Sequence, residues 1–277
     1  MRENFMTFFS LGILVSIVLA SMVVPLFFSA EANNPNVTLI GQPPSSSHLL
    51  GTDLMGRDVL YRVCLAGRTT MLIAFTAGVL MALMGVMYGA ISAMMPGFVD
   101  TALMGFLNVI ISLPVIFVAV ILRSIGGSSS VIQVTVIVAV TSWMFMAKMV
   151  WDEFVRLRGM EFVRQSMTLG AGRLGRFKWH LMPNALPTVV VIGTLGISQA
   201  VMLESTLSFL GLGVPSLIPT WGNMLADGYN ALMMKCWWLV VFPGGFLVFF
   251  ALTVNLLGDI LRDILDPCRE ADNGPTP

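Results

Sequence analysis

The chain of 277 residues alternates long apolar runs with short polar stretches. A helix needs roughly 20 apolar residues to cross a hydrocarbon core of about 30 Å. Runs of this length lie at 6–28, 69–94, 101–123, 131–151, 185–210 and 237–261. The pattern therefore predicts an all-α membrane protein with six transmembrane helices. The first run is too long for a signal peptide and has no convincing cleavage site, so we expect it to remain as a span.

Basic residues gather in one polar region, and this sets the expected orientation. Positively charged loops stay in the cytoplasm, and the segment 148–184 holds Lys148, Arg156, Arg158, Arg164, Arg173, Arg176 and Lys178. We therefore expect this segment to be cytoplasmic and, with an even number of spans, both termini as well. The segment 29–68 would then be external. It carries Arg57, Arg62 and Arg68, which oppose this assignment, but the bias of 148–184 is stronger.

Composition excludes several classes of protein. Hydrophobic residues make up 56% of the chain, charged residues make up 11%, and the mean hydropathy is +0.86. Soluble domains carry about 25% charged residues. The net charge is zero, which argues against nucleic-acid binding. The cysteines and histidines are widely spaced, so no metal site, disulfide or cofactor is expected. The sequence has no GxxxxGK[ST] phosphate loop, so the chain is not expected to hydrolyse ATP.

The longest polar stretch on the expected cytoplasmic side is 161–184, EFVRQSMTLGAGRLGRFKWHLMPN. Its first half predicts a short amphipathic helix, and the glycines from Gly170 onward predict a turn. Pro183 disfavours a helical conformation for the residue before it, so we expect one element to end there. Two interpretations follow from the pattern alone. The stretch is either an amphipathic loop on the membrane surface or a docking element for a soluble partner.

The segment after the first span is rich in proline, serine and asparagine over 29–50, which predicts an extended loop. The sequence GTDLMGRD follows at 51–58. Thr52 or Asp53 is expected to cap a helix that begins near Met55. Asp58 and Arg62 are four residues apart, so we expect them to pair on one helix face.

Polar residues inside the third and fifth spans are the candidates for a translocation path. A proline within a span frees a backbone carbonyl that small polar side chains can satisfy. A charged group in the membrane costs several kcal/mol, so it should face the protein interior or water. Each residue could instead have a purely structural role in a kinked or hydrogen-bonded helix. The candidates are Asn108, Ser112, Pro114, Ser198, Gln199 and Glu204.

Five ordered motifs carry a resemblance to a known family. They are GTDLMGRD, LGAG with HLMPN, LESTLSFLGLG, PTWGNML and NLLGDILRDILDP. Together they resemble the C-type permease subunit of the peptide/nickel family of bacterial ABC importers. The spacing from Gly170 to Pro183 fits the family's docking loop. The family's Glu-Ala-Ala falls on Arg164, Gln165 and Ser166, where this sequence departs from the pattern.

The resemblance implies a type I ABC importer permease fold in the bacterial cytoplasmic (inner) membrane. It divides the chain into an N-terminal span and external loop (1–68), a permease core (69–267) with its coupling loop (152–184), and a cytoplasmic tail (268–277). The implied ATPase-docking residues are Glu161, Phe162, Arg164, Gln165, Ser166, Gly170, Ala171 and Gly172. The family-signature residues are Gly51, Thr52, Asp53, Gly56, Arg57, Asp58, Pro183 and Asn184.

The implied function is ATP-driven import of a small solute, either a di- or oligopeptide or a nickel or other metal chelate. The modest chain length favours the metal-chelate members. Expected partners are a second, different permease, one or two cytoplasmic ATPases, an external solute-binding protein and membrane lipid. The alternative is an ion-coupled secondary transporter, which would need coupling charges within its spans; only Glu204 is clearly such a charge. A membrane enzyme would need a clustered nucleophile or carboxylate pair, and the spans contain neither.

Overall fold

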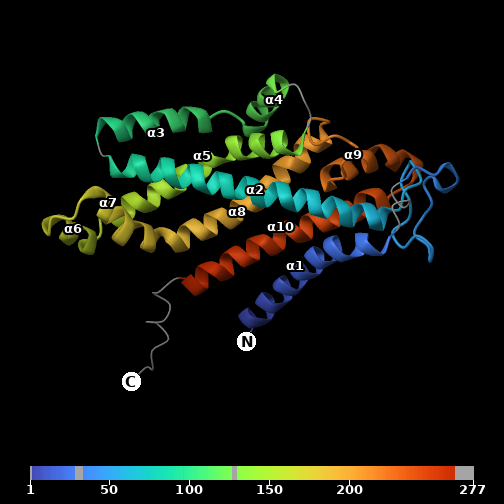
Figure 1. The fold of residues 1–277 in the computed structure, drawn as a ribbon, viewed down its shortest axis with the longest axis horizontal. Helices are drawn as coiled ribbons and strands as arrows, with labels where there is room; N and C mark the ends of the chain where they lie inside the picture. Colours follow the sequence, from blue (N-terminus) through green and yellow to red (C-terminus); the bar gives the residue numbers. More distant parts are fainter. Residues whose placement is uncertain (1, 29–33, 96, 127–129, 266–277) are drawn as a thin grey trace.

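The apolar runs form long helices in the computed structural model, which describes residues 2–28, 34–95, 97–126 and 130–265. Five helices of these ranges are long and apolar enough to cross a membrane. They are α1 (Arg2–Phe27), α2 (Val59–Met94), α5 (Val131–Arg158), α8 (Met182–Phe209) and α10 (Trp238–Leu265). Figure 1 shows them running along one elongated bundle. The expected all-α membrane fold is confirmed. The predicted tail 268–277 lies outside the described residues.

The third apolar run forms two helices instead of one kinked span. Helix α3 (Phe98–Ile111) and helix α4 (Val115–Ile125) meet at 87°. Pro114 takes the N-cap position of α4 with an extended ψ of 121°. Because proline has no N–H and restricts the residue before it, the helix cannot continue through this point. Counted as one broken span, the pair brings the bundle to the predicted six.

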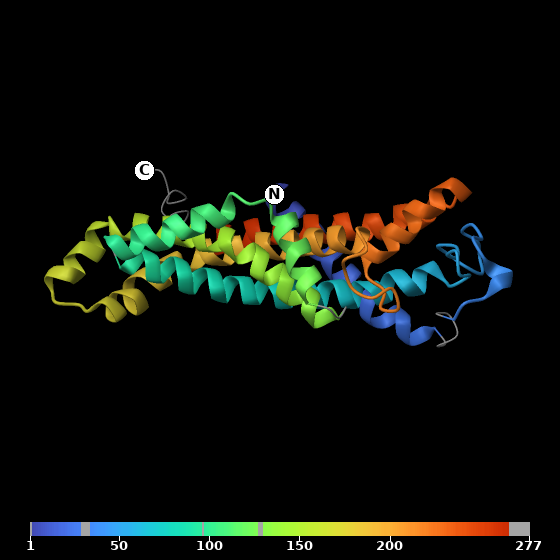
Figure 2. The same ribbon diagram turned by 90° about the horizontal axis from the view of Figure 1, so that it is seen from above.

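Helices α2 and α5 form the most extensive helix pair of the described chain, and Figure 2 shows them together near the middle of the bundle. Gly85 and Gly89 lie four residues apart on α2 and face α5. A Cβ atom at Gly89 would come within 2.5 Å of the Ala147 carbonyl oxygen and 2.9 Å of the Trp151 nitrogen. Small residues at this spacing let two helix backbones approach closely in a membrane.

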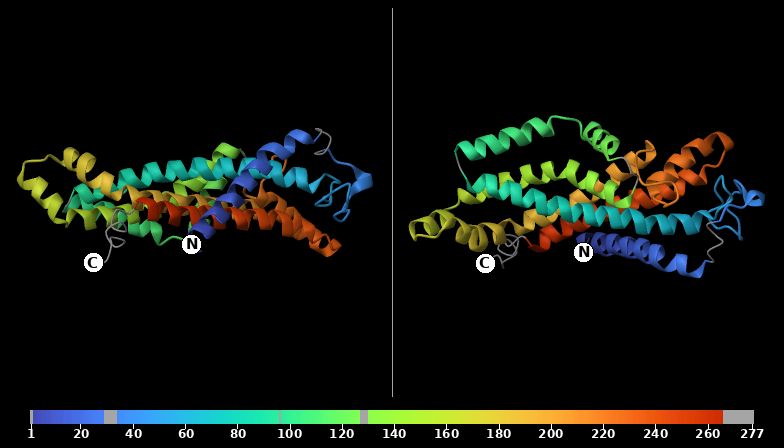
Figure 3. Two further views of the ribbon diagram at one scale, coloured as in Figure 1. Left: turned by 90° about the horizontal axis from the view of Figure 1, so that it is seen from below. Right: turned by 45° about the horizontal axis from the view of Figure 1, so that its top comes forward.

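Short elements close the two ends of the bundle. At one end lie α6 (Glu161–Thr168), α7 (Arg173–Arg176) and the π-helix η3 (Phe177–Leu181). At the other end lie the segment 34–58 with η2 (Val37–Leu39), and the elements α9 (Trp221–Ala231) and η4 (Leu232–Met234). Figure 3 shows that α1 begins and α10 ends toward the α6 end.

Two predictions about the start of α2 are wrong. The helix begins at Val59, and its cap is Asp58, whose Oδ1 accepts a hydrogen bond from the Tyr61 nitrogen. The expected Asp58–Arg62 pair does not form, since Arg62 lies 3.4 Å from Asp53 instead. The tight turn at 51–56 is the reason. It delays the helix by about one turn and occupies Asp58 with the capping bond.

The helix boundary expected at Pro183 is also absent. Met182 has helical dihedrals of −62° and −44°, and η3 continues directly into α8. Proline is tolerated in the first turn of a helix because its missing N–H would have no partner there. The π-turn before it, in which the Met182 N–H donates to the Phe177 carbonyl, accommodates the restricted residue.

We predict that Gly89→Ala will destabilise the chain. The added methyl group would meet backbone atoms of α5, which cannot move aside as a flexible side chain could, and overpacking of this kind costs about 1–3 kcal/mol. Gly105→Ala in α3 is the matched control, because its Cβ would have no atom within 4 Å. Thermal unfolding in detergent should give a lower midpoint for Gly89→Ala only. Equal midpoints would show that the α2–α5 contact is not this tight.

Candidate transport path and docking surfaces

A groove of about 680 Å³ lies beside the break between α3 and α4, and α5, α8 and α10 complete its walls. Its lining is mostly apolar. The polar members are all neutral: Thr141, Ser142, Ser198, Gln199, Thr206 and Asn255. No Asp, Glu, Lys or Arg belongs to the lining. The groove can therefore offer hydrogen bonds and apolar contacts to a solute, but no full charge.

The structure divides the six path candidates between two environments. Ser198 and Gln199 line the groove. Ser112 and Pro114 lie at the α3–α4 break next to lining residues, and the Ser112 hydroxyl donates to the Val109 carbonyl of its own helix. Asn108 is exposed on α3 and is not part of the lining.

Glu204 is fully buried and turned away from the groove. The Ser208 hydroxyl donates to its Oε1 atom at 2.7 Å, and the Ser205 hydroxyl lies 3.4 Å from its Oε2 atom. Thr220, the N-cap of α9, is a further neighbour of this carboxyl group. A buried carboxyl group needs such partners because leaving it unsatisfied would cost several kcal/mol. The geometry therefore fits the structural alternative, in which Glu204 joins α8 to the start of α9.

Helix α9 is held firmly against α2. Trp221, its first residue, has no solvent exposure. Its Nε1 atom donates to the Val63 carbonyl at 3.0 Å, and its backbone nitrogen donates to the Thr70 hydroxyl at 3.2 Å. The indole thus provides both apolar packing and a satisfied donor, as buried tryptophan usually requires.

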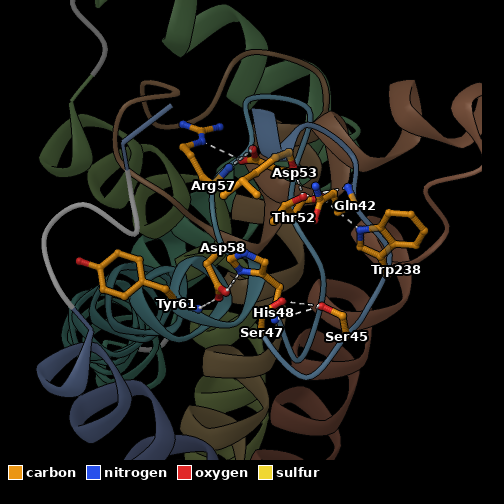
Figure 4. Close-up of polar contacts among 11 residues, drawn as sticks. Gln42, Ser45, Ser47, His48, Thr52, Asp53, Arg57, Asp58, Tyr61 and Trp238 are labelled. Carbon is orange, nitrogen blue, oxygen red and sulfur yellow. Dashed lines mark hydrogen bonds and ion pairs between the residues drawn. The ribbon is translucent and has the colours of Figure 1, made fainter. Parts of the chain in front are cut away.

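The signature GTDLMGRD forms a network of polar contacts before α2, which we call the signature network (Figure 4). One carboxylate organises it. The Asp53 Oδ1 atom accepts from the backbone nitrogens of Met55 and Arg57, and its Oδ2 atom lies 2.7 Å from the Arg57 Nε atom. Gly51 and Gly56 have φ angles of 77° and 74°, which favour glycine. A Cβ atom at Gly56 would also collide with the Asn36 carbonyl.

The signature network also connects distant parts of the chain. Trp238, the first residue of α10, donates its indole N–H to the Thr52 carbonyl at 3.1 Å. His48 Nδ1 lies 2.9 Å from Asp58 Oδ2 and so links the preceding loop to the α2 cap (Figure 4). Asp58 is 6% exposed. All six signature residues of this motif thus serve one local structure that fixes the starts of α2 and α10 relative to each other.

At the opposite end, α6 presents a polar face outward. Val163 is fully buried in a cluster with residues of α5, and Ser166 is 6% exposed. Gly170 follows with a φ of 83°, and the Ala171 nitrogen donates to the Ser166 carbonyl. The side chains left exposed on the helix are Glu161, Phe162, Arg164, Gln165 and Thr168, and Gly172 is exposed just beyond it. Seven of the eight predicted docking residues therefore lie on this surface or form its turn, while Ser166 packs inward.

The remaining two signature residues, Pro183 and Asn184, are exposed at the start of α8. The Asn184 Nδ2 atom donates to the His180 carbonyl at 2.6 Å. These two residues shape the entry into α8 and do not contact α6 through any hydrogen bond of the described chain.

Sequence reasoning missed two contributions. Asn255 lines the groove, and its buried Oδ1 atom has no hydrogen-bond partner among the described residues. An amide inside the last apolar run was a signal for this role. Asp100, in the first turn of α3, accepts hydrogen bonds from Ser92 and from the Trp151 indole. No sequence signal pointed to that pairing, because Trp151 is 51 residues away.

The chain is a bundle of membrane-length helices with a broken span beside an uncharged groove. Residues 74–270 match the family described as binding-protein-dependent transport system inner membrane component. The chain belongs to this family and is the permease subunit of an ABC importer in the bacterial inner membrane. As such it is not itself an enzyme. The ATPase is a separate subunit, and the family also implies a partner permease and a binding protein.

Relatives and solved structures support this assignment. The chain is 37% identical over 270 residues to a protein of Brucella suis biovar 1 named as a peptide permease protein, covering 97% of this chain and 89% of the relative. It is 34% identical over 266 residues to the oligopeptide transport system permease protein OppC of Bacillus subtilis, covering 96% and 87%. The MetNI methionine ABC transporter in an inward-facing conformation matches with a TM-score of 0.61 and 19% identity over 72% of this chain and 94% of that chain. This last likeness confirms the type I importer fold.

We predict that Asp53→Asn will destabilise the signature network before α2. Arg62 is 2% exposed, and removing the charge of its partner leaves a buried guanidinium group uncompensated, which costs about 3–5 kcal/mol. The matched control is Asp227→Asn, since Asp227 borders the same small cavity as Asp53 but has no ion pair among the described residues. Proteolysis of the 34–58 loop and thermal unfolding should both accelerate for Asp53→Asn alone. A similar response of the two variants would contradict this role.

Proposed function

We propose that this subunit forms one wall of a path for di- or oligopeptides, with a second, different permease as the other wall. One or two ATPases would dock at α6, and an external solute-binding protein would deliver the peptide. The uncharged groove beside α3 and α4 carries this proposal. Two relatives in Bacillus subtilis are named as oligopeptide and dipeptide transport system permease proteins, which supports a peptide over a metal chelate.

The chemistry of the groove suits peptides of varied sequence. Every peptide offers backbone N–H and C=O groups, whereas its side chains differ in charge and size. Asn255 presents an unsatisfied carbonyl oxygen, and Gln199 adds an exposed amide. A backbone N–H of the solute would give the Asn255 oxygen the partner that a buried acceptor requires. The apolar remainder of the lining would tolerate many side chains because it imposes no specific pairing.

The exposed faces of α3 and α4 support a second permease beside the groove. Phe106, Val109, Phe117 and Ile121 are each more than half exposed there. Lipid or a second subunit could cover apolar side chains in a membrane. A path for a polar solute, however, must be closed off from lipid, since unsatisfied polar groups are costly in hydrocarbon. A partner permease packed on this side would close the groove.

The proposed docking at α6 accounts for how ATP binding could reach the path. Val163 of α6 shares a buried cluster with Phe154 and Leu157 of α5 and with Leu181 before α8. A push on α6 would therefore act on both helices, and both contribute to the groove. In this proposal the α6 end is cytoplasmic, because it carries the basic segment. The start of α1 and the end of α10 would then lie on that side, since both point toward α6 (Figure 3).

We predict that Gly170→Val will weaken ATPase recovery about tenfold. Gly170 needs a positive φ angle of 83°, and this conformation costs a β-branched residue about 1–2 kcal/mol or more, so the turn that fixes α6 would shift. Affinity purification of the importer with its ATPase measures the effect. Gly211→Val is the matched control, because Gly211 has a φ of 75° and equally open surroundings at the opposite end of the bundle.

Normal ATPase recovery with Gly170→Val, alongside normal membrane insertion, would contradict docking through α6. Purification of the unmodified chain tests the wider proposal in the same experiment. A second permease and a P-loop ATPase should be recovered with it. Recovery of the chain alone, active in liposomes without ATP, would overturn the assembly proposed.

We predict that Asn255→Leu will raise the KM for peptide uptake about fivefold to tenfold, since a hydrogen bond to a buried acceptor contributes about 1 kcal/mol. Leucine keeps the size of the side chain and removes only the amide. Asn230→Leu in α9 carries the same change outside the groove and should leave uptake unchanged. Transport by the reconstituted importer at several peptide concentrations measures both. An unchanged KM for Asn255→Leu would remove Asn255 from the path.

A further inference from the structure

A second exposed surface follows α6 in sequence and is separate from the α6 surface. We define it as the cationic tryptophan face, made of Arg173, Leu174, Lys178 and Trp179. Leu174 is 77% exposed and Trp179 is 70% exposed. The Lys178 Nζ atom lies 5.2 Å from the centroid of the Trp179 ring. Large apolar side chains so exposed, next to basic ones, indicate a surface that meets a partner.

The segment of α7 and η3 has an outer side and an inner side. Leu174, Lys178 and Trp179 are exposed on the outer side. The opposite side is anchored. The Phe177 ring stacks on Phe154 of α5 with centroids 5.9 Å apart, and Leu181 is 2% exposed. Because this inner side is fixed on α5, the outer side cannot rotate into the protein.

The depth of Trp179 matches that of a second lysine–tryptophan pair. On α5, Lys148 lies 4.1 Å from the centroid of the Trp151 ring. Counted from the Phe154–Phe177 stack toward the bundle, Trp151 is three residues away and Trp179 is two. Both tryptophans therefore lie within about one helical turn of the stacked pair. Tryptophans gathered at one depth, with lysines beside them, are typical of the lipid headgroup region.

The positive charge of the cationic tryptophan face favours binding of an anion. The sequence has no acidic residue from 162 to 203. The acids of the neighbouring α5 end are already paired, Asp152 with Lys148 and Glu153 with Arg156. None of the ion pairs between described residues involves the basic side chains of the face. Its positive charge is therefore not neutralised within the described chain.

We propose that the cationic tryptophan face binds the headgroups of anionic phospholipids. Lys178 and Arg173 would contact lipid phosphates, while Leu174 and the Trp179 ring would enter the boundary with the acyl chains. The face continues directly into α8, so it meets the membrane at the start of a helix that crosses it. Helix α6 belongs to a separate surface at the end of the bundle. Bound lipid would thus fix the position of α8, which carries Ser198 and Gln199 of the groove.

The test uses the complete importer in nanodiscs that contain photoactivatable phosphatidylglycerol or, in a parallel sample, photoactivatable phosphatidylcholine. Mass spectrometry measures the lipid label on the segment 173–182. We expect several-fold more label from phosphatidylglycerol. Lys178→Glu should lower this ratio about fivefold or more, since one basic group near an anionic surface contributes about 1 kcal/mol. Lys178→Arg should preserve the ratio, because it keeps the charge.

Lys235→Glu is the matched control, since it makes the same charge change at the other end of the bundle and should leave the ratio at 173–182 unchanged. ATPase recovery is measured for every variant. Unchanged recovery with a lowered ratio in Lys178→Glu supports a lipid site. Equal labelling by the two lipids in the unmodified importer would overturn it. Loss of the ATPase at an unchanged ratio would also overturn it and assign the face to the ATPase.

Discussion

The close approach of α2 and α5 is the contact on which the rest of the bundle depends. In a bilayer the helices gain no hydrophobic driving force from association, so packing and hydrogen bonds must hold them together. Gly85 and Gly89 bring the two backbones together over the half of the bundle nearest α6. The broken pair α3–α4 and helix α8 then pack around this centre. The groove exists because α3 and α4 diverge at Pro114 while α2 and α5 hold their position.

Polar contacts fix the ends of the same helices, and their arrangement differs between the two ends. Before α2, Asp53 collects two backbone N–H groups and two arginines into one rigid turn. At the α6 end, Asp100 joins the last turn of α2 to α5 through Ser92 and Trp151. The first is a local network that also contacts distant parts of the chain, and the second connects two helices directly. Both lie where the long helices end, and both satisfy groups that hydrocarbon could not.

The sequence allowed prediction of the helices and less of what joins them. Apolar runs determine spans because the bilayer sets both length and polarity. Each predicted run forms a helix except the third, which forms the broken pair α3 and α4. Side-chain pairing depends on turns that the pattern does not specify. Asp58 caps α2 and binds His48 because the turn at Gly51 and Gly56 has already committed Asp53 to Arg62. The burial of Glu204 and the break at Pro114 were each foreseen only as alternatives, since both depend on neighbouring helices.

Helix α8 brings the functional regions of the subunit into one element. Its first turn follows the π-turn of η3, whose inner side packs against α5 near α6 and whose outer side bears Lys178 and Trp179. Its middle carries Ser198 and Gln199 into the groove. Its far end is joined to α9 through Glu204. Because the far end is held in this way, a small displacement of the start of α8 would move the groove residues. The buried carboxyl group of Glu204 would then mark the fixed end of α8, and the π-turn would mark the end that moves. This gives a physical reason for a glutamate to occupy a membrane helix without lining the path.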